Sequence, residues 1–309
     1  MTVIRDSFTV PGLSDGLQVP YVEFRGRYDG PHLTVIAGIH GCEYTGMAAV
    51  RRLIAEIDPD QLRGRITAVP VVAVPSFLAA TPFVVPQDGK NLNRCFPGDP
   101  GGSYTEILAH HVFERFFLGS DCVVDLHAGD IGEALEAMTI YDESPVEDEA
   151  RALAHVFGTK HVVRQPAGAR TVAGTTSAAA ADAGIPAIAA ESGGNGLLTA
   201  ADIDLHVQGV HNVIGHLGML PIHPVLPEGQ SEHTAGWNWV RAPVPGWWES
   251  QVELGEPVEA GKVIGHISNI HGDAPHEITA PESGIPLILA TSPSVSERSL
   301  LVAIARRTE

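Results

Sequence analysis

Three side chains that could bind one metal ion follow two apolar segments of the chain. His40 and Glu43 lie in the turn AGIHGCEYTG, directly after an apolar run, and His127 ends the run VVDLH. Side chains at the carboxyl ends of buried strands meet at the crevice where open α/β sheets bind ligands. Two imidazoles and one carboxylate form the ligand set of catalytic zinc, which leaves a fourth position for water. The His-x-x-Glu spacing alone is weak evidence, because a turn histidine beside an acid at a helix start gives the same pattern.

Four more polar residues are predicted to lie near this crevice. Asp125 precedes His127 by two residues on the same strand face and could accept a hydrogen bond from its second ring nitrogen. In the loop NLNRCFPG, Asn93 and Arg94 could bind a carboxylate, although Arg94 could equally be an ordinary surface arginine. Glu191 follows the apolar run in AIAAESGG and could carry a proton during hydrolysis, or simply cap a helix.

Apolar runs alternate with helix-period stretches between about residues 30 and 220. The predicted strands are His32 to Ile39, Ile66 to Val74, Asp121 to Leu126, Thr139 to Tyr141 and Ile185 to Ala190. Helices are predicted near residues 47–57, 107–117, 147–157 and 201–217. Several of the strand runs are apolar at consecutive positions, as expected of strands covered on both faces by crossover helices. This pattern predicts an α/β fold with a mostly parallel, doubly wound sheet.

After Pro221 the sequence pattern changes to short β-like runs that are interrupted by glycine and proline. We therefore predict two domains, an α/β catalytic domain over residues 1–222 and a smaller all-β sandwich over residues 223–309. The motif Ala-Pro-x-x-Gly begins at Ala242 and again at Ala280, which predicts two similar β-halves. The spacing of valines and glycines in this part resembles a biotinyl/lipoyl-type β-sandwich. Lys262 lies within the first half, so a carrier function is disfavoured, and a lid or an oligomer contact is the expected use.

The composition excludes several classes of protein. The chain has 309 residues, with 37 acidic against 19 basic side chains and a net charge of −18, so nucleic acids and anionic membranes are not expected partners. The hydrophobic fraction of 44% is enough for a substantial core, and no apolar run is long enough to span a bilayer. The first residues lack a signal-peptide pattern, and three cysteines do not form a disulfide framework. These features predict a soluble, cytoplasmic protein.

The segments AGIHGCEYTG, NLNRCFPG, VVDLHAGD and AIAAESGG, in this order, resemble the succinylglutamate desuccinylase/aspartoacylase family. The resemblance implies a mostly parallel or mixed sheet of the zinc carboxypeptidase type. Within the family, the chain looks most like deacylases of the N-acetyl-diaminobutyrate deacetylase type. The resemblance also implies one Zn²⁺ per chain, with His40, Glu43 and His127 as ligands.

The implied activity is zinc-dependent removal of an acyl group, acetyl or succinyl, from a small N-acylated amino acid. Asn93 and Arg94 would bind the substrate carboxylate, and Glu191 would serve as general base and then general acid. Alternatives are a carboxypeptidase-type peptidase and a catalytically silent zinc- or ligand-binding protein, and the chain could form a homo-oligomer. Family members often have another arginine upstream of NLNR, but VPSFLAATPFVVPQDG contains none. Zn²⁺ alone could polarise the scissile carbonyl, or Arg164 or Arg170 could replace the missing arginine.

Overall fold

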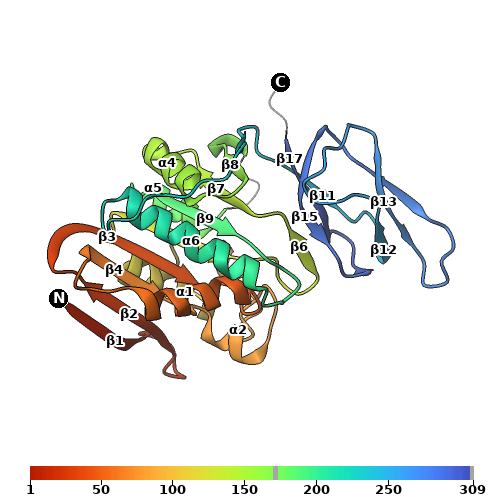
Figure 1. The fold of residues 1–309 in the computed structure, drawn as a ribbon. Helices are drawn as coiled ribbons and strands as arrows, with labels where there is room; N and C mark the ends of the chain where they lie inside the picture. The colour runs from red at the N-terminus through yellow and green to blue at the C-terminus, as the bar shows by residue number, and fades with distance from the viewer. Residues whose placement is uncertain (170–172, 307–309) are drawn as a thin grey trace.

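The computed structural model describes residues 1–169 and 173–306. In these residues, nine strands form one large mixed sheet, in the order β1-β2-β4-β3-β5-β9-β7-β8-β10 (Figure 1). Their bounds are β1 Thr2–Thr9, β2 Gln18–Arg25, β3 Tyr28–Ala37, β4 Arg63–Val69, β5 Cys122–His127, β7 Met138–Asp142, β8 His161–Gln165, β9 Ala187–Glu191 and β10 Ser231–His233. Five of the neighbouring pairs are parallel and three are antiparallel.

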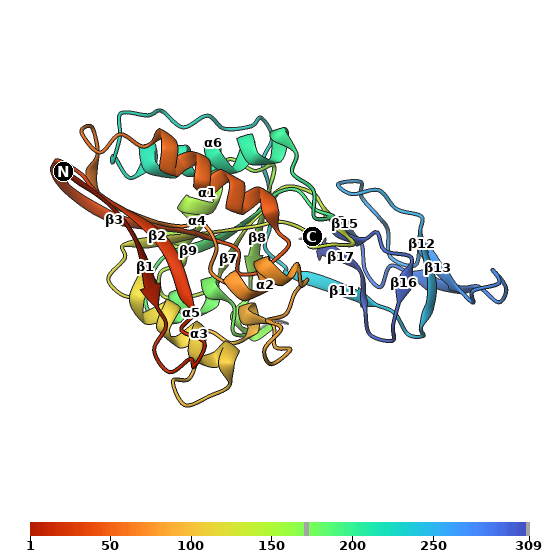
Figure 2. The same ribbon diagram turned by 90° about the horizontal axis from the view of Figure 1, so that it is seen from below.

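Helices cover both faces of this sheet, which explains why its central strands are apolar at consecutive positions. The helices are α1 Tyr44–Glu56, α2 Val74–Ala79, α3 Tyr104–Val112, α4 Glu147–Phe157, α5 Thr176–Asp182 and α6 Ala200–His216. In β3, Val35 packs in the core that includes α1, α4 and α6, whereas its neighbour Ile36 packs in the core that includes α3 and α5. Figure 2 shows α1 and α6 on one face of the sheet and α3 and α5 on the other. Consecutive residues of such a strand are therefore mostly apolar, because both faces of the strand are covered.

Two smaller antiparallel sheets are built mainly from the C-terminal part of the chain. One sheet has the order β11-β17-β15-β6 and the other β14-β13-β12-β16. Their bounds are β6 Glu133–Leu135, β11 Trp237–Arg241, β12 Gly246–Ser250, β13 Val263–Ser268, β14 His276–Thr279, β15 Gly284–Ala290, β16 Ser294–Val295 and β17 Leu300–Arg306. The glycines that end the two Ala-Pro-x-x-Gly motifs begin β12 and β15, so the repeat starts one strand in each sheet.

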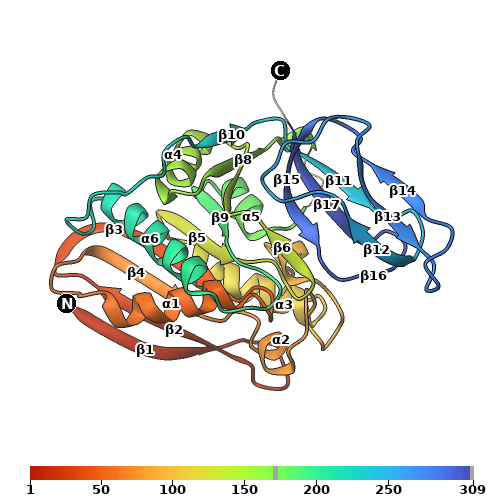
Figure 3. The same cartoon turned by 45° about the vertical axis from the view of Figure 1, so that its right-hand side comes forward.

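Two strands cross between the N-terminal and C-terminal parts of the chain. The short β6 comes from the N-terminal part but pairs with β15, where Ile288 lies opposite Leu135 (Figure 3). In return, β10 comes from beyond residue 222 and pairs with β8 of the large sheet. The two parts of the chain are therefore joined by backbone pairing in both directions.

The predicted mixture of helices and strands is confirmed, with some differences. The helix predicted at residues 147–157 is α4, and the one predicted at 201–217 is α6. The run from Ile66 to Val74 is not one strand, because β4 ends before Pro70, whose ring nitrogen has no hydrogen to donate to a ladder, and α2 begins at Val74. The antiparallel β1 and β2 were not predicted. No helix within the described residues is both long and apolar enough to span a membrane.

Candidate active site

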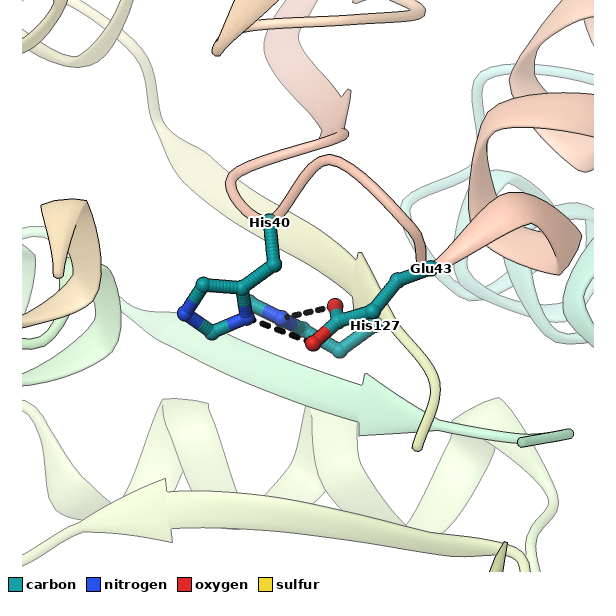
Figure 4. A group of neighbouring side chains, drawn as sticks. All are labelled: His40, Glu43 and His127. Carbon is teal, nitrogen blue, oxygen red and sulfur yellow. Dashed lines mark hydrogen bonds and ion pairs between the residues drawn. The ribbon is translucent and has the colours of Figure 1, made fainter. Parts of the chain in front are cut away.

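The side chains of His40, Glu43 and His127 meet at the carboxyl ends of β3 and β5 (Figure 4). The Nδ1 atom of His40 lies 2.5 Å from Oε1 of Glu43, and Nδ1 of His127 lies 2.8 Å from Oε2 of the same carboxylate. One ligand atom from each residue falls within 4.8 Å of the others, and all three residues are buried. The structure therefore brings together the three predicted metal ligands around one point.

The turn between β3 and α1 places two of these side chains. A Cβ atom at Gly41 would lie 2.3 Å from the carbonyl carbon of Ser76, so only glycine lets the turn pack against α2. Glu43 is the residue directly before α1. The hydroxyl of Thr45, in the first turn of α1, donates to the carbonyl of Ser192 at 2.7 Å, directly after β9. This bond fixes the start of α1 against the end of a neighbouring strand.

The second ring nitrogen of each histidine also has a partner. Nε2 of His127 lies 2.8 Å from Oδ2 of Asp125, which confirms the predicted contact, and Thr176 donates to the same oxygen at 2.5 Å. Nε2 of His40 lies 3.0 Å from Oδ1 of Asn91. Outer partners of this kind fix the tautomer and orientation of metal-binding imidazoles. Two Nδ1 atoms and one carboxylate, oriented in this way, fit the donor set of zinc.

Charge also holds this cluster together. Burial opposes ionisation of Glu43, but the imidazoles of His40 and His127 outweigh it and hold the pKa of the carboxyl well below its usual range. Burial likewise opposes protonation of His127, yet the carboxylates of Asp125 and Glu43 raise its pKa well above the ordinary value. A divalent cation would therefore compete with protons for the same nitrogen atoms.

Glu191 ends β9 beside the cluster. In the parallel pairing of β5 and β9, Glu191 lies directly opposite His127. Burial is the main reason why the pKa of Glu191 is raised above the usual glutamate value, and the nearby carboxylate of Glu43 adds to this effect. A carboxyl group with a raised pKa in a cavity is suited to accepting and returning a proton near neutral pH.

All six residues predicted for the site line one cavity of about 460 Å³. Asn93 and Arg94 lie in the 3₁₀ turn Leu92–Arg94, where Oδ1 of Asn93 accepts a bond from the backbone of Thr176 and the Arg94 guanidinium donates to the Asn93 carbonyl at 2.6 Å. Other lining residues come from the sheet that contains β11, β15 and β17. The C-terminal part of the chain is therefore a wall of the cavity.

Among the polar residues of this cavity that the sequence did not predict are one amide and two charged side chains, Asn91, Glu133 and Arg241. Asn91 is the first residue of the NLNR segment, so its closeness in sequence to Asn93 and Arg94 could have indicated that it lies in the site. Glu133 and Arg241 have no local motif, since the pairing of β6 with β15 and the approach of β11 bring them to the cavity. Trp239, near the start of the C-terminal part, also lines the cavity.

Of the two arginines suggested as replacements, the structure describes only Arg164. Arg164, on β8, forms ion pairs with Glu147 at 2.6 Å and Glu143 at 3.3 Å, and it does not line the cavity. Arg170 lies outside the described residues. In the segment that lacks an arginine, Phe83 lines the cavity, and its ring centroid lies 6.2 Å from that of His40. The upstream segment thus contributes an apolar wall.

The chain matches the model of the succinylglutamate desuccinylase/aspartoacylase catalytic domain over residues 29–217, and it belongs to this family. It is 30% identical, over 305 residues, to the N-alpha-acetyl-L-2,4-diaminobutyric acid deacetylase of Halomonas elongata, covering 92% of this chain and 84% of that protein. The family resemblance predicted from the sequence is confirmed.

Solved structures share the fold over nearly the whole chain. The product-bound ectoine utilization protein EutE (DoeB) from Ruegeria pomeroyi matches with a TM-score of 0.89 at 23% identity, over 99% of this chain and 95% of that one. A succinylglutamate desuccinylase/aspartoacylase from Rhodobacter sphaeroides matches with a TM-score of 0.86 at 24% identity, over 99% of this chain and 96% of that one. The large mixed sheet and the two antiparallel sheets are thus a fold shared with these proteins.

Proposed function

We propose that this protein is a zinc-dependent amide hydrolase that removes an acyl group, acetyl or succinyl, from a small N-acylated amino acid with a free carboxylate. One observation carries the proposal: a zinc-type ligand set, a half-buried glutamate and two arginines line a single cavity. The similarity to a diaminobutyric acid deacetylase supports the same reaction class. The proposal includes a large sheet of the zinc carboxypeptidase type and a division into a catalytic domain, residues 1–222, and a β-sandwich of biotinyl/lipoyl type, residues 223–309.

One Zn²⁺ per chain would be held by His40, Glu43 and His127. A zinc ion in such a site polarises the scissile carbonyl and lowers the pKa of a bound water from ~15.7 toward ~7. Two residues outside the ligand set orient the imidazole rings. Asp125 and Asn91 each hold one imidazole through Nε2, so that both Nδ1 atoms point toward Glu43 and the cavity.

Glu191 is the proposed proton carrier. Its carboxylate accepts a proton from the attacking water and then donates this proton to the nitrogen that leaves, so the products are a carboxylic acid and an amine. Arg94 and Arg241 bind the substrate carboxylate and fix the amide bond relative to Glu191. Phe83 lines the cavity in the segment that lacks the usual upstream arginine, so a bound zinc ion would supply the polarisation of the carbonyl.

A substrate screen tests this proposal. The purified protein, loaded with one equivalent of Zn²⁺, is incubated with N-acetyl, N-succinyl and N-formyl amino acids, and release of primary amine is measured. We expect turnover of at least one acyl class, loss of turnover with a chelator and recovery when zinc is restored. Cleavage of C-terminal residues from peptides, with no cleavage of N-acyl amino acids, would favour the peptidase alternative. Stoichiometric zinc without turnover of either substrate class would favour the silent alternative.

A further inference from the structure

The cavity contains opposite charges that do not pair with one another. Glu133 lies in it together with Arg94 and Arg241, yet within the described parts of the chain none of these three side chains forms an ion pair. Elsewhere, arginines of this chain do pair with acids, as Arg151 does with Glu232 at 2.6 Å. Opposite charges that share a partly desolvated cavity but remain apart suit a ligand that carries both signs.

The backbone holds Glu133 firmly at its position. Its amide donates to the carbonyl of Asp130 at 2.9 Å, and its carbonyl accepts from the amide of Asn195 at 2.7 Å. The carbonyl is so closely surrounded that a Cβ atom at Gly129 or Gly194 would lie within 2.5 Å of it. The side chain therefore lines the cavity from a fixed point, and its carboxylate has a backbone partner at Asp130 but no side-chain partner among the described residues.

The surroundings of Glu133 are unfavourable for a lone carboxylate. Burial, followed by the carboxylates of Glu43 and Asp130, raises the pKa of Glu133 to about 7. A cationic group placed beside it would relieve both the desolvation and the repulsion.

Arg94 and Arg241 place like positive charges near each other, as Glu133 and its acidic neighbours place like negative charges. The cavity walls partly desolvate Arg94 and lower its pKa, and the positive charge of Arg241 lowers it further. The guanidinium of Arg241 is positioned by a bond to the carbonyl of Arg298 at 3.0 Å. A carboxylate from the substrate would relieve this repulsion, as a cation would relieve the repulsion at Glu133.

We propose that Glu133 is a specificity-determining residue that binds a cationic group on the substrate side chain, so that the preferred substrates are N-acylated diamino acids. The carboxylate of such a substrate lies with Arg94 and Arg241, and its side-chain ammonium lies with Glu133. This inference rests on the proposed deacylase function and deepens it. It also explains why an acidic protein has both signs of charge in one cavity.

Kinetics with a matched pair of substrates test this role. Nα-acetyl-2,4-diaminobutyrate and N-acetylnorvaline have side chains of the same length, and they differ in a terminal ammonium or methyl group. We expect the zinc-loaded protein to prefer the cationic substrate at least tenfold in kcat/KM, on the order of one charge-assisted hydrogen bond. Glu133→Gln keeps the shape of the side chain and removes its charge, so this preference should fall about tenfold or more. Equal use of both substrates by the native protein, or an unchanged preference in Glu133→Gln, would overturn the proposal.

Glu136→Gln is the matched control. Glu136 is three residues further along and faces Gly255 rather than the cavity, so its variant should keep the native preference. A calorimetric titration of the zinc-loaded protein with diaminobutyrate and with norvaline separates this inference from the proposed function. If no N-acyl amino acid is hydrolysed, the deacylase function fails. Tighter binding of diaminobutyrate, lost in Glu133→Gln, would still support the role of Glu133, and equal binding of the two amino acids would reject it.

Discussion

The two ends of the cavity differ in how their polar groups are satisfied. At the end formed by β3 and β5, both ring nitrogens of His40 and of His127 have protein partners, and the Glu43 carboxylate lies within hydrogen-bond distance of Nδ1 in both rings. At the other end, Arg94, Arg241 and Glu133 contribute charges that no ion pair within the described residues neutralises. Both ends belong to the same cavity, but the first lies deeper, since His40, Glu43 and His127 are buried whereas Arg94 and Arg241 are exposed and Glu133 is half-buried.

Under the proposed function, this difference separates two tasks of the site. Groups that must keep one geometry through every turnover are fixed by other protein groups, because misplacement by about 1 Å can cost ~10²-fold in rate. Groups that recognise a substrate remain available to it, at the cost of keeping partly desolvated charges without counter-ions. We call the end with His40, Glu43 and His127 the paired end, and substitutions there should change chemistry or metal binding. We call the end with Arg94, Arg241 and Glu133 the unpaired end, and substitutions there should change substrate affinity.

The largest effect is expected for Glu191→Gln, which removes the carboxyl group proposed to carry the proton. Turnover of the best substrate should fall by ~10²–10⁴-fold, the usual contribution of general acid–base catalysis. The zinc content, measured by elemental analysis, should stay at one per chain, because Glu191 is not among the three ligands. Full activity in this variant would remove Glu191 from the mechanism, and loss of zinc would mean that Glu191 serves the metal.

Asp125→Asn tests the paired end, with a smaller effect. The amide keeps the size of the side chain but removes the charge beside Nε2 of His127, so zinc affinity or activity should fall ~10–100-fold. Competition with a metal-binding dye measures the affinity. Asp204→Asn is the control, since Asp204 pairs with Arg52 on the surface and should leave zinc affinity unchanged. Equal zinc affinity in the native protein and Asp125→Asn would show that the outer carboxylate does not support the ligand.

Arg241→Gln tests the unpaired end and has the smallest expected effect. With Arg94 still present, KM for the N-acyl amino acid should rise about tenfold and kcat should change little, the pattern for a group that binds substrate and transition state equally. Steady-state kinetics separate the two constants. Arg306→Gln, which breaks an ion pair with Glu282 far along β17, should leave both constants unchanged. A large fall in kcat at constant KM would move Arg241 into the chemical step.

The paired end could be predicted from the sequence because its information is local. His40, Glu43 and His127 each follow a run of apolar residues, and parallel strands bring their carboxyl ends to one edge of a sheet. The contact of Asp125 with His127 follows from the two-residue period of a strand. The boundaries of α4 could be predicted as well, because a cluster of acids opens the helix and Gly158 ends it.

The unpaired end could not be predicted, because it depends on pairing between distant segments. β6 has three residues, and its partner β15 lies about 150 positions further along the chain. No local pattern indicates that Glu133 and Arg241 approach the same cavity. β1 was missed for a different reason, since it is an edge strand whose side chains are mostly exposed and lack an apolar signal.

The exchange of strands between the two parts of the chain has a consequence for any attempt to shorten the protein. Cutting after residue 222 would remove β10 from the edge of the large sheet and leave β6 without β15. Unpaired strand edges promote aggregation, and the same cut would also remove Arg241. Neither fragment would therefore be a faithful substitute for the whole molecule, and deletion experiments on the C-terminal part would confuse misfolding with loss of catalysis.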